Sequence, residues 1–194
     1  LYKAVFYNRL NFVDYLIELG ANVNLGDGEG LSPLHIAAIE NLPGMIKALK
    51  DKGADIEAKD KYGYTPLHLA ADQGSFNAAQ QLIYASANVN SRSEWDGTPL
   101  HASVANKNIN MSRLLMINGA KLGLKDRLGR TSIHWAAEKG DLAIAKLLLT
   151  NGAKIDSKDN DGETALHEAA QWGHLKLIQF FIGQGANVNA VGSD

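Results

Sequence analysis

The sequence predicts an all-α solenoid in which helix-turn-helix repeats are joined by β-hairpin-like turns. A motif of Ser/Thr, then Pro, Ser or Ala, then Leu or Ile, then His begins at residues 32, 65, 98, 131 and 164, so its copies start 33 residues apart. A motif of Gly or Ser followed by Ala begins at residues 20, 53, 86, 119, 152 and 185, again with a period of 33. Two motifs that share one period over nearly the whole chain indicate stacked copies of one supersecondary unit.

Each repeat is predicted to open with a short helix. Thr65 precedes Pro66. A threonine hydroxyl caps free backbone N–H groups, and proline in the first helical position loses no hydrogen bond. Ala70 and Ala71 follow, and their small side chains give the helix a closely packing face. Gly74 is predicted to end this helix, because glycine adopts the left-handed conformation at the lowest cost.

A second helix and a turn complete the repeat. Apolar residues at helical spacing predict a helix over about 142–150, which Gly152 closes in the same left-handed way. Residues 153–156 are predicted to be extended, and the Asp-Asn-Asp-Gly sequence of 159–162 is typical of a turn. One such unit cannot bury its own apolar face, so neighbouring units must stack.

This pattern resembles the ankyrin repeat family, which has the same period and a Thr-Pro-Leu-His-x-Ala signature, complete here at residues 65–70. The resemblance covers five full repeats, 27–59, 60–92, 93–125, 126–158 and 159–191, after a partial repeat, 1–26. We therefore expect a single ankyrin repeat domain over residues 1–194. Neither terminal repeat has the polar outer face of a capping repeat, so we expect a window of a longer protein in which further repeats, or another covering segment, flank it.

Some residues depart from the repeat pattern. Ser86 replaces the glycine that closes a second helix, and a left-handed serine costs about 1 kcal/mol. Lys107 replaces the glycine that ends a first helix, whereas Asn8 at the equivalent position tolerates the left-handed conformation. Ser103 stands in place of alanine in the same repeat as Lys107. We therefore expect repeat 93–125 to be the least rigid.

A histidine recurs in every full repeat, as His35, His68, His101, His134 and His167. Two ligands of one zinc ion lie within roughly 4 Å of each other, whereas packed helices lie about 8–10 Å apart. The spacing therefore argues against a shared metal site. We expect each imidazole to bond to the capping hydroxyl and to nearby hairpin backbone, and His174 to make a local structural contact.

Composition and motif content exclude several classes of function. The formal net charge is −2, from 19 basic and 21 acidic side chains, which does not fit nucleic-acid binding. Cysteine is absent, and no apolar run is long enough for a transmembrane helix, so we expect no direct membrane insertion. The serine-elbow, phosphate-loop, zinc-protease and EF-hand motifs are missing. We predict that the chain is not an enzyme and uses no metal or cofactor. The composition leaves the compartment unknown, with the cytoplasm as the default.

The resemblance implies that the hairpin tips and the exposed ends of the first helices line a concave face on which partners dock. On this chain the candidate residues are Tyr62, Tyr64, Arg92, Trp95, Arg127, Arg130, Glu138 and Trp172. Tyrosine, tryptophan and arginine dominate binding hot spots. The alternative is that these rings pack on adjacent hairpins and serve stability, as we expect for Trp135, which lies within a first helix.

We predict a monomeric, non-catalytic scaffold that binds a protein partner on this face, and no nucleic acid. One alternative is a small-ligand or nucleotide sensor that stacks a base on Trp95 or Tyr64. A second alternative is a structural spacer within a long repeat or toxin-like protein. The resemblance also raises hydroxylation of Asn24, Asn90 or Asn189, which the sequence does not decide. Nor does the sequence identify the partner.

Overall fold

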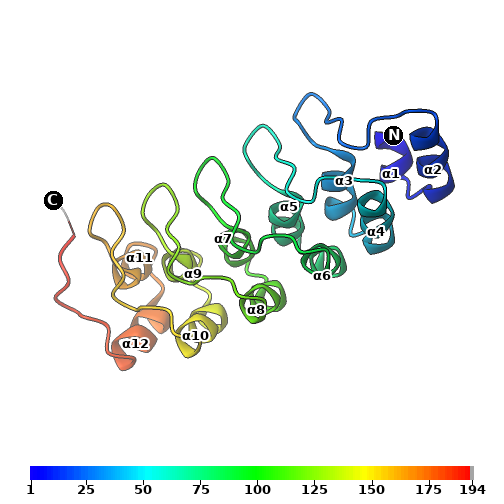
Figure 1. Ribbon diagram of the computed structural model, residues 1–194. Helices are drawn as coiled ribbons and strands as arrows, with labels where there is room; N and C mark the ends of the chain where they lie inside the picture. Colours follow the sequence, from blue (N-terminus) through cyan, green and yellow to red (C-terminus); the bar gives the residue numbers. More distant parts are fainter. Residues whose placement is uncertain (193–194) are drawn as a thin grey trace. The chain divides into compact units, whose positions relative to one another are not determined.

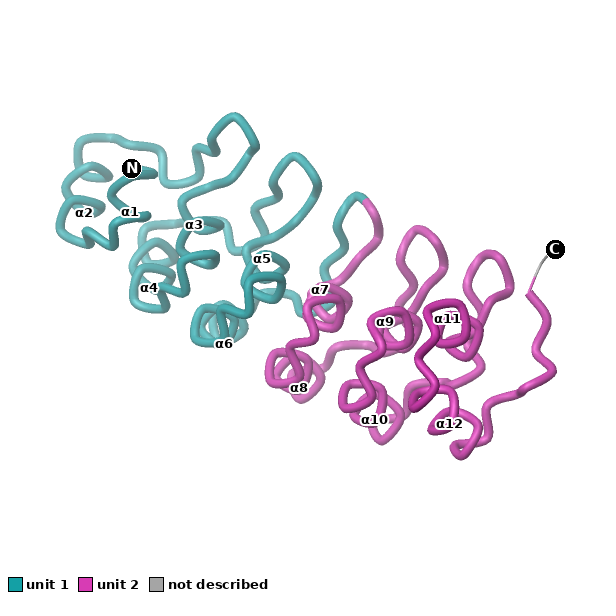
Figure 2. Tube along the Cα trace, turned by 180° about the vertical axis from the view of Figure 1, so that it is seen from behind, with its two compact units in different colours: residues 1–94 teal, residues 95–194 magenta. Residues whose placement is uncertain are grey.

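The computed structural model describes residues 1–192, and over these residues the chain forms twelve helices and no β-strand. The predicted all-α repeat fold is confirmed. The helices come in pairs, and within each of the two units described next the loops between pairs project from one side of the helices (Figure 1). The chain divides into two compact units, Leu1–Glu94 and Trp95–Asp194, which we call unit 1 and unit 2 (Figure 2).

Unit 1 contains three helix pairs. Its helices are α1 (Tyr2–Phe6), α2 (Leu10–Glu18), α3 (Pro33–Ile39), α4 (Pro43–Asp51), α5 (Pro66–Gln73) and α6 (Phe76–Tyr84). Helix α3 packs on α1, α4 and α5, while α6 packs on α4 and α5. Leu49 and Leu82 are 33 residues apart and both are fully buried. The period of the sequence is therefore also the period of the core.

Unit 2 repeats this arrangement. Its helices are α7 (Pro99–Ala105), α8 (Ile109–Ile117), α9 (Ser132–Glu138), α10 (Leu142–Thr150), α11 (Ala165–Gln171) and α12 (Leu175–Gly183). Helix α9 packs on α7, α10 and α11, while α10 also contacts α8 and α12. Leu115, Leu148 and Phe181 continue the buried series at the same spacing. Helix α10 spans the predicted range.

The recurring histidines hold the helix starts, as predicted. The Thr131 hydroxyl lies 2.9 Å from His134 Nδ1, and the Thr131 N–H donates to the same nitrogen at 3.1 Å. The other ring nitrogen, Nε2, lies 3.2 Å from the carbonyl oxygen of Glu163. In unit 1, His35 Nε2 lies 2.9 Å from the carbonyl oxygen of Tyr64. These imidazoles tie one helix start to the hairpin of the next repeat.

The left-handed positions are also where the sequence places them. Ser86 has a φ of 71°, Lys107 a φ of 55° and Asn8 a φ of 53°. The buried hydroxyl of Ser103 lies 2.9 Å from that of Ser112, so the departure from alanine is compensated by a hydrogen bond. The lower rigidity of repeat 93–125 stays a prediction.

Candidate functional site

An aspartate at the start of a hairpin fixes the backbone of its tip. The Asp126 carboxylate accepts hydrogen bonds from the N–H groups of Leu128 and Arg130, both at 2.9 Å. Asp159 makes the equivalent pair of bonds in the next hairpin. Because the turn is closed by its own side chain, the residues at the tip project from a defined backbone.

Consecutive hairpins of unit 2 are also tied to one another. The Arg127 N–H donates to the Trp95 carbonyl oxygen at 2.9 Å, and the Asn160 N–H donates to the Leu128 carbonyl oxygen at 3.0 Å. These bonds join successive loops on the side from which the loops of unit 2 project (Figure 1). The tips of unit 2 therefore form one row with fixed neighbours.

Three of the predicted residues lie in unit 1. Tyr62 is 44% exposed at a hairpin tip, and the Lys61 ammonium lies 4.9 Å from the centre of its ring. Tyr64 is half-buried; its ring centre lies 5.6 Å from that of His68, and burial raises the pKa of its hydroxyl. Arg92 is exposed. Tyr64 thus contributes to packing, whereas Tyr62 projects outward.

The other five lie in unit 2, where two of them meet at the hairpin tips. The Arg127 guanidinium carbon lies 5.4 Å from the centre of the Trp95 ring. Trp95 is 53% exposed, and Leu128, at the next tip, is 57% exposed. Leu128 was not among the predicted site residues. The sequence could have identified Leu128, because residues 62, 95 and 128 are spaced by 33 and therefore occupy equivalent positions in successive repeats.

Arg130 and Glu138 are brought together in a closed group, which we call the Arg130 network: Asp126, Arg130, Trp135, Glu138 and Lys139. Arg130 donates from Nε to Asp126 at 3.1 Å and from a terminal nitrogen to Glu138 at 2.9 Å. Its guanidinium carbon lies 4.2 Å from the centre of the Trp135 ring, and the Trp135 indole donates to Asp126 at 3.0 Å. The Arg130 side chain is only 17% exposed. Its charge is therefore largely satisfied within unit 2.

Trp172 lies directly after α11 and is 55% exposed. Burial, and then the charge of Glu138, raise the pKa of Glu168. His174 follows closely, and its Nε2 lies 3.0 Å from the carbonyl oxygen of Glu138. The expected contact of His174 is structural, but it reaches the preceding repeat and is not local.

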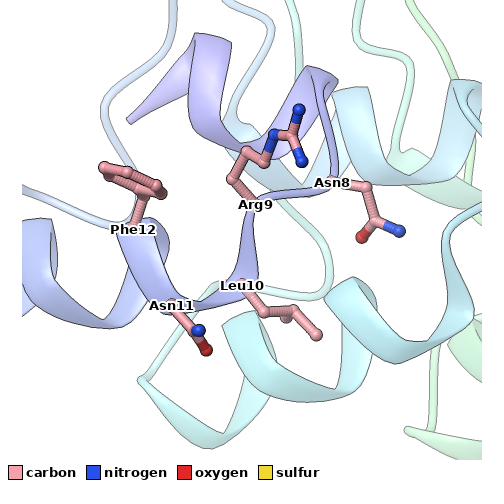
Figure 3. A pocket seen from close by; sticks show the side chains of 5 residues that line it. All are labelled: Asn8, Arg9, Leu10, Asn11 and Phe12. Carbon is pink, nitrogen blue, oxygen red and sulfur yellow. The ribbon is translucent and has the colours of Figure 1, made fainter.

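The structure shows a pocket in unit 1 that is lined by consecutive residues, Asn8, Arg9, Leu10, Asn11 and Phe12. Their side chains diverge, and they come from one turn and the start of α2 (Figure 3). A specific ligand site needs polar groups that converge, so this hollow does not have the form of one.

Among residues 1–192, no group of three or more His, Asp or Glu side chains is placed to hold a metal ion. None of the helices described here has the length and apolar character needed to cross a membrane.

These features define a helical repeat protein in which backbone hydrogen bonds join successive hairpins within a unit. The sequence profile described as ankyrin repeats (3 copies) matches residues 1–93, 60–126 and 100–191. The chain therefore belongs to the ankyrin repeat family, as the sequence predicted. Repeats of this family serve in general as protein-interaction scaffolds and not as enzymes.

Two similar proteins illustrate this membership. An ankyrin repeat protein of fowlpox virus (strain NVSL) is 39% identical over 51 residues, which are 26% of this chain and 12% of that protein. The crystal structure of the ankyrin repeat domain of Bcl-3, a unique member of the IκB protein family, is similar with a TM-score of 0.88 and 27% identity. That likeness covers 98% of this chain and 88% of the Bcl-3 chain.

Proposed function

We propose that this chain is a non-catalytic scaffold that binds a partner protein through its hairpin tips and the adjoining ends of its first helices. One observation carries the proposal. In each unit the tips expose large apolar side chains on a fixed backbone: Tyr62 is 44% exposed in unit 1, and Trp95 is 53% and Leu128 57% exposed in unit 2. Rigid side chains on a preformed backbone lose little entropy on binding.

The predicted site residues divide into two groups under this proposal. Those with exposed side chains are proposed to touch the partner: Tyr62, Arg92, Trp95, Arg127 and Trp172. Those already engaged inside their unit are proposed to support the surface: Tyr64, Arg130 and Glu138. We also propose that residues 1–194 act as one ankyrin repeat domain with the repeat bounds given above.

The rival proposal of a small-ligand or nucleotide sensor needs a pocket beside Trp95 or Tyr64. The pocket of Figure 3 is lined by neither residue. Protein binding is the function that we carry forward, because the exposed hairpin tips support it directly. The experiment below decides between it and the spacer alternative.

Affinity capture from an extract of the natural source tests the proposal with two matched baits. The hairpin variant carries Tyr62→Ala, Trp95→Ala and Leu128→Ala. The control variant carries Tyr84→Ala and Ile117→Ala, at the ends of α6 and α8, where the side chains are 86% and 77% exposed. Both must keep the circular dichroism and melting temperature of the original chain.

The proposal expects proteins that the original chain and the control variant recover and the hairpin variant does not. Equal recovery by both variants would place the binding surface elsewhere. Recovery of nothing above background by any bait would favour the spacer alternative.

A further inference from the structure

We infer that the hairpin tips of unit 2 recognise a peptide segment in which a carboxylate side chain lies close to a large apolar one. The recognising surface consists of Trp95, Arg127 and Leu128, and we call it the tip patch. This inference rests on the proposed function and specifies the chemistry of the partner.

The apolar part of the tip patch comes from two neighbouring hairpins. The backbone bond from the Arg127 N–H to the Trp95 carbonyl oxygen, at 2.9 Å, holds the tip of Leu128 next to that of Trp95. Each side chain leaves more than half of its surface exposed, 53% for Trp95 and 57% for Leu128. Exposed large apolar side chains on neighbouring tips whose backbone is fixed favour an interaction site. Trp95 and Leu128 are the residues that we expect to contact an apolar side chain of the partner peptide.

The charged part is Arg127, and the contrast with Arg130 shows why. Arg130 is paired with two carboxylates, those of Asp126 and Glu138. Over residues 1–192, by contrast, Arg127 has no carboxylate at ion-pair distance, and its guanidinium rests on the Trp95 ring. A stacked guanidinium still offers its N–H donors at the edge, in a geometry that matches a carboxylate. Its charge is thus available to a partner.

The surroundings of Arg127 do not compete for it. The carboxylate of Asp126 is occupied by the Arg130 network and its side chain is only 6% exposed. In the next hairpin the equivalent position is Asn160, a neutral residue whose amide donates to the Arg127 carbonyl oxygen at 3.0 Å. Asp161 stands at the tip beyond Leu128 and would repel a second carboxylate there. A partner carboxylate therefore has one favoured place, at Arg127.

A single-stranded nucleic acid is the other polymer that pairs stacking with anion binding. It is disfavoured here, because a leucine tip offers no ring for a second base and a net charge of −2 does not attract a polyanion. An acidic, apolar peptide fits both halves of the tip patch.

Selection from a phage-displayed library of random twelve-residue peptides tests the inference on the whole 194-residue chain. Four baits are compared: the original chain, Trp95→Ala with Leu128→Ala, Arg127→Glu, and the control Arg113→Glu. Arg113 is exposed on α8, also in unit 2, so the control makes the same change of charge away from the tips. The most enriched peptide is then synthesised and its Kd is measured for each bait.

We expect enriched peptides to carry Asp or Glu within a few residues of Leu, Ile, Phe or Trp. Arg127→Glu should weaken the best peptide about tenfold or more, as loss of a close charge pair at an interface does, and should itself enrich peptides with Lys or Arg. The Trp95→Ala, Leu128→Ala bait should lose the peptide, and Arg113→Glu should leave its Kd unchanged. A single-stranded oligonucleotide that binds the original chain more tightly than this peptide would assign the surface to nucleic acid instead.

The inference would also be overturned if no peptide were enriched on the original chain, or if the enriched peptides lacked acidic residues. An unchanged Kd in Arg127→Glu, or in the Trp95→Ala, Leu128→Ala bait, would overturn it as well. The affinity capture is therefore repeated with the Trp95→Ala, Leu128→Ala bait and with the Arg127→Glu bait. If the captured proteins are lost with the first bait but not with the second, the scaffold proposal stands and only the partner chemistry falls. If both of these baits, and the hairpin variant that also lacks Tyr62, recover the same proteins as the original chain, both proposals fail.

Discussion

Gly140 tests how consecutive repeats are held together in unit 2. Replacing it with alanine should destabilise unit 2 more than the same change at Gly173. Both glycines are left-handed, with φ of 66° and 72°, so either alanine costs about 1–2 kcal/mol in backbone strain. At Gly173 a Cβ would meet no atom within 4 Å, whereas at Gly140 it would lie 2.5 Å from Cε1 and 2.6 Å from Nδ1 of His174.

The magnitude follows from what holds the His174 ring. The ring would have to move to admit the methyl group, but its Nε2 lies 3.0 Å from the carbonyl oxygen of Glu138. Losing the partner of a buried or half-buried carbonyl costs about 1–3 kcal/mol. Gly140→Ala should therefore lower the free energy of unfolding by about 2–5 kcal/mol, against about 1–2 kcal/mol for Gly173→Ala.

Urea unfolding followed by tryptophan fluorescence measures the difference, because all three tryptophans, Trp95, Trp135 and Trp172, lie in unit 2. A double-mutant cycle with His174→Ala isolates the clash. In that background Gly140→Ala should cost no more than Gly173→Ala does in the original chain. Equal losses for the two glycine variants, or a Gly140→Ala effect that His174→Ala leaves unchanged, would refute the reasoning.

Three further changes test other parts of the structure. Asp126→Ala should lower the free energy of unfolding by about 1–3 kcal/mol more than Asp159→Ala in urea titrations. Both carboxylates bond to two backbone N–H groups, but only Asp126 also holds the Arg130 network, and equal losses would show that the network adds nothing. Ser86→Gly should stabilise unit 1 by about 1 kcal/mol in thermal melts, since φ at residue 86 is 71°, while the control Ala85→Gly, at φ −77°, should give no gain. Burial lowers the pKa of His134, so the unfolded chain binds a proton at this residue more readily than the folded chain does. Protonation of His134 therefore lowers the free energy of unfolding as the pH falls below about 6.5, the usual pKa of histidine. The drop in melting temperature between pH 7.5 and 5.5 should therefore be smaller in His134→Gln, and an equal or larger drop would contradict the sign.

The sequence predicts the helices well because their signals are local and recur along the chain, the capping residue in five repeats and the left-handed residues in six. A capping Thr or Ser, a left-handed residue after the first helix and another after the second are chemical properties of single positions. They remain legible even at Ser86 and Lys107, where the residue is not glycine but the φ is 71° and 55°. The fold needs no information about distant contacts beyond the period itself.

The surface is less predictable because contacts between hairpins decide what each side chain does. Arg127 and Arg130 are both arginines, three positions apart in one turn, and the sequence predicts that both bind the partner. Closure of the turn carries Arg130 to Glu138 and Asp126, at 2.9 and 3.1 Å, and leaves Arg127 on the ring of the preceding hairpin. Substituting Arg130 therefore breaks a partly buried network and changes folding along with any binding. Substituting Arg127 removes an exposed cation–π contact with Trp95 but breaks no ion pair of unit 2. If the melting temperature of the variant is unchanged, a loss of binding there can be assigned to the partner contact itself.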